Sequence, residues 1–124
     1  MSMEKHGGML PTFKAAADLS AKQFYCVEIT AADTVNVCNA ATDVVAGILQ
    51  NKPVAGEACE IPENGIVKGI AAGAITAGQW VGTDANGQLV AKTTDKDFAY
   101  GIALEAGAAN RIIAVLIRPC FLGV

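Results

Sequence analysis

Hydrophobic and polar residues alternate along most of the chain after Lys22, with the period of two that is typical of β-strands. The clearest case is Tyr25, Val27 and Ile29, which share one face of a predicted strand. Similar short segments recur at residues 24–30, 34–38, 44–50, 58–61, 66–70, the two arms of 79–91, 98–105 and 111–118. No amphipathic helix of useful length separates them. The pattern therefore predicts eight or nine short strands.

Turn residues separate these segments. Asn86-Gly87 lies between two alternating arms and predicts a tight hairpin, because both residues tolerate positive φ. Asn64-Gly65 has the same chemistry just before the segment 66–70 and predicts a second hairpin. Residues 106–110 form a turn between the last two strands. Short strands at this spacing indicate an all-β domain, either a small β-sandwich or a small barrel.

The first 20 residues do not share this pattern. They begin without periodicity and then place several apolar residues around a proline: Met9, Leu10, Pro11 and Phe13. We interpret residues 1–20 as an extended N-terminal arm that contacts a partner, and residues 21–124 as the β domain. A frayed terminus without a binding role is the alternative.

The last predicted strand is apolar on both faces. Ile113, Val115 and Ile117 form one face, and Ile112, Ala114 and Leu116 form the other. A strand of a two-layer domain normally leaves one face in water, so this strand either lies under a cover or packs against another subunit. We assign Ile113, Val115 and Ile117 to a subunit interface. Trp80 is a further interface candidate, with a place in the core as the alternative.

Small side chains dominate the apolar composition. Hydrophobic residues make up 52% of the chain but aromatic residues only 6%, and the chain contains 23 alanines and 13 glycines. Small side chains bury little area each, so we expect a monomer of modest stability. Gly47 and Gly101 occupy matching places in two similar segments, and we expect them to permit close packing or a bulge.

Charge and hydropathy argue against two classes of partner. The net charge is −3 and the nine basic residues are dispersed, so we expect no direct contact with nucleic acid. The most apolar run, 112–117, is far shorter than the ~20 residues that cross a bilayer, so we expect no membrane partner. The N-terminus lacks the order of segments that marks a secretory signal, which predicts that the chain stays in the cytosol where it is made.

The sequence offers few residues of the kinds that catalysis usually needs. His6 is the only histidine and lies in the predicted arm, where no rigid site holds it. Asp95 and Asp97 provide fewer oxygens than a hard cation generally needs. We therefore expect no catalytic residue, no metal and no cofactor. The alternative is a trimeric ligand-binding or enzymatic module with a pocket at the subunit interface, lined by Asp84, Asn86 and Asp95.

The chain contains four cysteines at irregular spacing: Cys26, Cys38, Cys59 and Cys120. The gaps do not fit a CxxC zinc or redox pair. We expect packed, reduced thiols. A cross-strand disulfide between Cys26 and Cys38, or a metal site with only one histidine available, is the alternative.

Several segments occur in a distinctive order between residues 44 and 118. They are Ala46-Gly-Ile-Leu, Gly56-Glu-Ala-Cys-Glu-Ile, Gly65-Ile-Val-Lys-Gly, Ala77-Gly-Gln-Trp-Val-Gly-Thr-Asp-Ala-Asn-Gly-Gln-Leu and Tyr100-Gly-Ile-Ala-Leu-Glu-Ala-Gly. This order resembles that of the bacteriophage capsid cement, or head decoration, proteins. The chain departs from the family pattern at Gln79, where an Asp is usual, at its cysteines, and in the C-terminal Phe121-Leu-Gly-Val.

The resemblance implies a β-sandwich or β-tulip-like domain that forms homotrimers and binds the major capsid protein on the outside of an icosahedral head. The protein would be made in the host cytoplasm and would stabilise the virion against the pressure of packaged DNA. Another β-rich virion component, such as a spike base or a head–tail piece, is the alternative within structural proteins.

Overall fold

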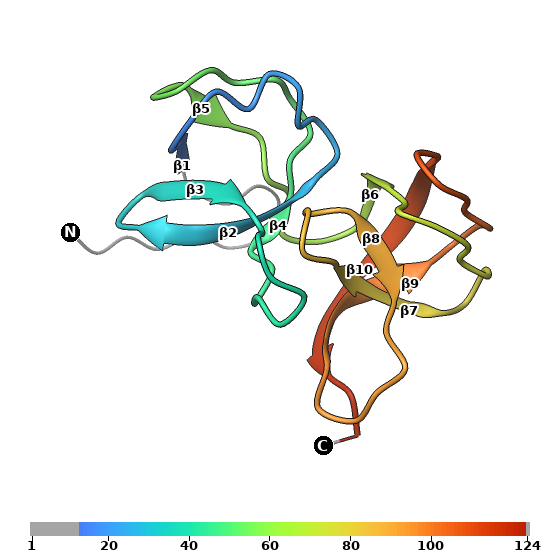
Figure 1. The fold of residues 1–124 in the computed structure, drawn as a ribbon. Helices are drawn as coiled ribbons and strands as arrows, with labels where there is room; N and C mark the ends of the chain where they lie inside the picture. The colour runs from blue at the N-terminus through green and yellow to red at the C-terminus, as the bar shows by residue number, and fades with distance from the viewer. Residues whose placement is uncertain (1–12, 124) are drawn as a thin grey trace.

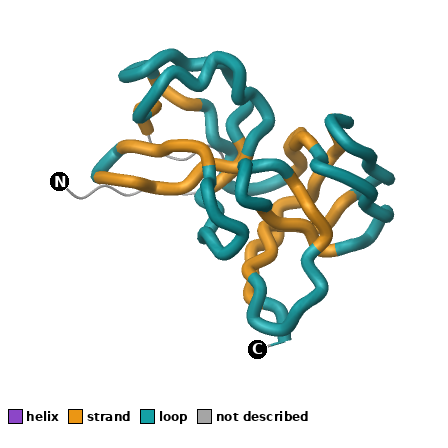
Figure 2. The backbone as a smooth tube through the Cα atoms, viewed as in Figure 1, coloured by secondary structure: helices purple, strands orange, loops and turns teal. Residues whose placement is uncertain are grey.

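The computed structural model describes residues 13–123, which form ten strands in two five-stranded sheets (Figure 1). The strands are β1 (Phe13–Ala15), β2 (Cys26–Ala31), β3 (Thr34–Val37), β4 (Gly47–Ile48), β5 (Ala58–Cys59), β6 (Ile66–Ile70), β7 (Trp80–Thr83), β8 (Leu89–Ala91), β9 (Phe98–Ala103) and β10 (Ile112–Phe121). Within this described part there is no helix, and hence none that is long and apolar enough to cross a membrane (Figure 2). The all-β prediction is confirmed.

The first sheet comes from the N-terminal half of the chain, in the order β4-β2-β3-β1-β5. β1 runs parallel to β3 and antiparallel to β5, whereas β2 is antiparallel to both its neighbours. Side chains from these strands and from the loops beside them form a small cluster: Ala15, Leu19, Val27, Val35, Leu49, Cys59 and Ile61, with Phe13 and Val37 packed against it. The start of the described chain is therefore part of this sheet.

The second sheet comes from the C-terminal half, in the order β6-β10-β9-β7-β8. A bridge between Ala71 and Leu89 brings the end of β6 to β8, the strand at the opposite edge. The sheet consequently curls into a half-closed barrel with its apolar side chains inside. β10 lies centrally between β6 and β9 and is the longest strand of the molecule (Figure 1).

The two sheets share one core. Cys26, Val45 and Ile48 from the first half pack in the same cluster as Val115 and Leu89 from the second. Backbone hydrogen bonds also join them, since the N–H of Cys26 donates to the carbonyl of Gly87 at 2.7 Å. The sheets therefore form one folding unit, although each is built from its own half of the sequence.

One predicted hairpin is confirmed and one is wrong. β7 and β8 pair antiparallel around Asn86-Gly87, with Gly87 at φ 81°. Asp84 holds this turn, because its carboxylate accepts hydrogen bonds from the N–H groups of Asn86 and Gln88 at 2.8 and 2.9 Å. Asn64-Gly65 instead connects the two sheets. Its glycine has φ 89°, but β5 pairs with β1 and β6 pairs with β10, so no hairpin forms there.

Gly47 and Gly101 occupy tight positions, as expected from the sequence. A Cβ on Gly47 would collide with the side chain of Ile61. A Cβ on Gly101 would collide with the carbonyl oxygen of Leu116 and lie 2.9 Å from a methyl of Val115. In both places the backbone of a strand packs where a side chain would not fit.

We expect Gly101→Ala to lower the free energy of unfolding by about 1 to 3 kcal/mol, because the new methyl group must push β9 away from β10. Gly73→Ala is the matched control, since open space surrounds Gly73 and its φ is not positive. Denaturant unfolding of both variants measures the difference. Equal stabilities would contradict the tight packing described for Gly101.

Candidate functional site

The outer face of the second sheet is apolar across four strands. Residues that lie directly opposite one another in a sheet point to the same side, so the register identifies this face. On β6 and β10 the opposing pairs are Ile66 with Leu116, Lys68 with Ala114, and Ile70 with Ile112. The row continues across β9 and β7, where Ile102 lies opposite both Leu116 and Trp80.

This face is open to solvent, although most of it is hydrophobic. Ile66 is 65% exposed and Ile112 is 45% exposed, and Leu104 follows β9 at 44%. Ile70, Trp80 and Leu116 are half-buried. A contiguous exposed apolar surface of this kind on a small protein marks an interaction site. We call it the outer face and define it by Ile66, Lys68, Ile70, Trp80, Ile102, Ile112, Ala114 and Leu116.

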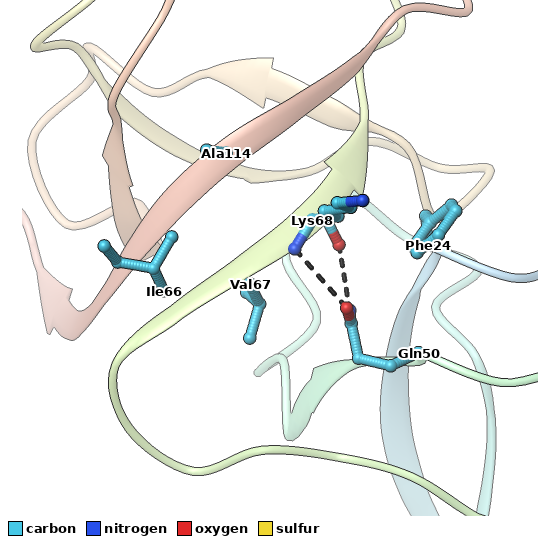
Figure 3. Close-up of a pocket in the computed structure, with 6 residues that line it drawn as sticks. All are labelled: Phe24, Gln50, Ile66, Val67, Lys68 and Ala114. Carbon is cyan, nitrogen blue, oxygen red and sulfur yellow. Dashed lines mark hydrogen bonds between the residues drawn. The ribbon is translucent and has the colours of Figure 1, made fainter.

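A groove of about 440 Å³ crosses the β6 side of the outer face (Figure 3). Phe24, Gln50, Ile66, Val67, Lys68 and Ala114 line it. A second hollow adjoins it and shares three of those residues, with Glu105 and Ile112 on its far side. Phe24 and Gln50 belong to the first half of the chain, so the two halves build the groove together.

Phe24 occupies an unusual backbone conformation at this groove. Its φ is 72°, in the left-handed region that costs an L-residue with a side chain about 1 to 2 kcal/mol. The strain is held by two hydrogen bonds: its N–H donates to the carbonyl of Leu49 at 2.6 Å, and its carbonyl accepts from the N–H of Ile70 at 3.0 Å. Strained residues of this kind concentrate at functional sites.

Gln50 closes the free edge of β6. Its side-chain N–H donates to the carbonyl of Lys68 at 2.9 Å, and its side-chain oxygen accepts from the N–H of Lys68 at 3.4 Å (Figure 3). One amide thus imitates the partner strand that an edge lacks. The groove therefore lies where the outer face meets this closed edge of β6.

Two charged residues line the groove and its neighbouring hollow, Lys68 on β6 and Glu105 beyond β9. The Glu105 carboxylate accepts a hydrogen bond from the N–H of Ala114 at 3.0 Å, which fixes it beside β10. Lys68 lies opposite Ala114 on the other flank. The apolar centre of the outer face therefore has one charge of each sign beside it.

The four residues that the sequence assigned to a subunit interface lie on two different faces of the second sheet. Ile113, Val115 and Ile117 are 1%, 0% and 7% exposed and fill the core of their own chain. Their surfaces are already covered, whereas Ile112 on the opposite face of β10 is 45% exposed. Trp80 is half-buried and lies on that outer face. The subunit interface itself stays a prediction.

The predicted arm falls mostly outside the described residues, and Met9, Leu10 and Pro11 are among those that lie outside. Phe13 is described, and the structure places it in β1, half-buried against the first sheet's own cluster. Residues 13–20 thus contribute a strand and the buried Ala15 and Leu19 to the domain. Capsid binding by the arm stays a prediction.

The residues of the alternative ligand pocket do not line either hollow of the outer face. The carboxylate of Asp84 accepts hydrogen bonds within the β7–β8 turn, and Asn86 is exposed in the same turn. Asp95 lies near Gly123, at the far end of β10. Within residues 13–123 no group of three or more potential metal ligands occurs.

Comparison with known proteins decides the family. A family model described as "phage cement protein" matches residues 5–119, nearly the whole chain. The chain belongs to the phage cement protein family. It is therefore a virion structural protein of a bacteriophage, as its resemblance to that family implied.

A solved structure supports the fold of this cement-family chain. The crystal structure of the head fiber gp8.5 N base in bacteriophage phi29 superposes with a TM-score of 0.66 at 16% identity, covering 94% of this chain and 99% of that one. The likeness extends over both sheets. No curated protein sequence gives a significant match.

The cysteines of this cement-family chain are free thiols, and all but Cys120 are buried. Cys26 and Cys38 face each other on β2 and just after β3, where the N–H of Cys38 donates to the carbonyl of Cys26 at 3.0 Å. Burial raises the pKa of Cys38 to about 12 and also raises the pKa of Cys26. Burial therefore disfavours the thiolate form of both, and the packing of Cys26, Cys38 and Cys59 agrees with the expectation of buried cysteines.

We expect Phe24→Gly to be more stable than Phe24→Ala by about 1 kcal/mol, because glycine adopts positive φ without strain whereas alanine does not. Both variants lose the same ring from the groove, so the ring's packing cancels in the comparison. Thermal or denaturant unfolding measures the difference. An alanine variant as stable as the glycine variant would show that Phe24 carries no backbone strain.

We expect Cys26 and Cys38 to resist alkylation in the folded protein at pH 8, because only the thiolate reacts and burial holds both in the thiol form. Cys120, which is partly exposed, should be modified first. Peptide mass spectrometry after a timed alkylation identifies the sites, and the unfolded protein serves as the control. A disulfide-linked Cys26–Cys38 peptide in freshly purified protein would contradict this expectation.

Proposed function

We propose that this protein is a capsid decoration protein. It assembles as a homotrimer, binds the major capsid protein on the outer surface of an icosahedral phage head, and stabilises the shell against the pressure of packaged DNA. The observation that carries the proposal is membership of the phage cement protein family across residues 5–119. The mechanism is mechanical, since bridging neighbouring capsid subunits adds interface area that must be broken before the shell ruptures.

Two features of the molecule support an assembly role. The outer face presents Ile66 and Ile112 to a partner, and Leu104 is exposed just beyond β9. Leaving these side chains in water contributes nothing to the stability of a single copy. The N-terminal residues Met9, Leu10 and Pro11 add further apolar groups. Three copies of such an arm on one trimer would bind multivalently, so weak individual contacts would suffice.

A second candidate is the base of a head fibre, a module that fixes a longer appendage to the capsid. The fold similarity to the phi29 head fiber N base favours it, because that similarity extends over nearly all of both chains. Both candidates place the protein on a phage head. They differ in what the protein carries on its outward side.

We expect purified trimers added to undecorated heads to raise the temperature at which the heads release their DNA. A fluorescent dye that reports DNA exposure follows the release during heating, with undecorated heads as the reference. Release at the same temperature, with the protein demonstrably bound, would refute stabilisation and leave binding intact. Copy number per head, from quantitative gel analysis, then separates a cement protein present in high copy from the base of a few appendages.

A further inference from the structure

We propose that the outer face of β6 and β10 is the contact between copies of this chain, and that Lys68 of one copy forms an ion pair there with Glu105 of its neighbour. This inference rests on the proposed trimer and deepens it by naming the surface and the pair of charges that align the subunits.

The face has the apolar centre that such a contact needs. Ile66 on β6 is 65% exposed and Ile112 on β10 is 45% exposed, and the small Ala114 lies between the rows they belong to. A small residue at the centre lets two surfaces approach closely, and the large residues around it supply the buried area. Phe24 adds an aromatic ring at the groove, and aromatic residues are enriched in the centres of protein interfaces.

The arrangement of charge favours a second copy as the occupant. Lys68 and Glu105 are the charged residues among those that line the groove and its neighbouring hollow, and they flank Ala114 from opposite sides. Around a threefold axis, the Lys68 side of each copy can face the Glu105 side of the next, so a surface with one charge of each sign can pair with itself in a closed ring. A partner with a strongly charged surface of one sign would be attracted by one of these residues and repelled by the other.

The backbone restricts how the copies meet. Gln50 already occupies the N–H and carbonyl of Lys68, and the carbonyl of Phe24 occupies the N–H of Ile70. Association through β6 therefore uses side chains across the face and not strand addition at the edge. The hydrogen bond from Ala114 to Glu105 holds the carboxylate in place before the neighbour arrives, so little side-chain entropy is lost on its side.

The test is charge reversal with rescue, using the full chain. Lys68→Glu places like charges across the proposed contact. We expect the variant's trimers to dissociate at a protein concentration about tenfold higher than the wild-type trimers do. The double variant K68E/E105K restores the pair in the reverse sense and should recover much of the assembly. Lys14→Glu is the matched control, because Lys14 is exposed on β1 of the other sheet and should leave the mass unchanged. Sedimentation velocity over a concentration series measures the mass, and circular dichroism verifies folding.

Lys68 is exposed, so its reversal should not prevent folding. A K68E protein that keeps the wild-type mass over the whole series overturns the proposal. If that protein also fails to co-sediment with heads, the outer face contacts the capsid instead, and the decoration role stands while this inference falls. A wild-type chain that remains monomeric yet binds heads likewise overturns the inference without touching head binding. A wild-type trimer that ignores heads would overturn the proposed function alone.

Discussion

Ile48 packs against the backbone of Gly69, and this contact is what allows two small sheets to share one core. A Cβ on Gly69 would lie 3.1 Å from the Cδ1 of Ile48 and 2.5 Å from that of Leu89. A side chain at Gly69 would take space that Leu89 of β8 and Ile48 of β4 fill inside the half-closed barrel. At Gly69 the area lost with the missing side chain is recovered by closer packing of its neighbours.

The shared core determines which surface is left for partners. The interior of the second sheet is filled by the chain's own residues, including Ile113 and Val115. These buried side chains leave no surface there for another molecule to contact. The opposite side of the same strands then carries isoleucines and a leucine that the monomer leaves partly in water. The hydrophobic effect that folds the domain is consequently incomplete in a single copy. An apolar face across four strands is the part of the molecule where the remaining free energy is available for assembly.

The sequence predicted the elements better than their pairing. Period-two alternation located most strands, and the chemistry of Asn86-Gly87 identified the β7–β8 turn. It could not distinguish the inner from the outer face of β10, because both faces are apolar and alternation carries no signal there. It misread Asn64-Gly65, since positive φ suits a link between sheets as well as a hairpin. The parallel pairing of β1 with β3 and the left-handed Phe24 both depend on contacts distant in sequence, which no local pattern records.

The amide of Gln50 has a consequence for the size of any assembly. A sheet with a bare edge accepts a strand from a neighbour, whose own bare edge accepts the next, and such growth has no natural end. Gln50 fills that position on β6 with a group that belongs to the same chain and cannot be passed on. Contacts made through a face are instead governed by a rotation, and a rotation that returns to its starting point closes a ring. At this edge the amide of Gln50 therefore disfavours growth into a fibre by strand addition.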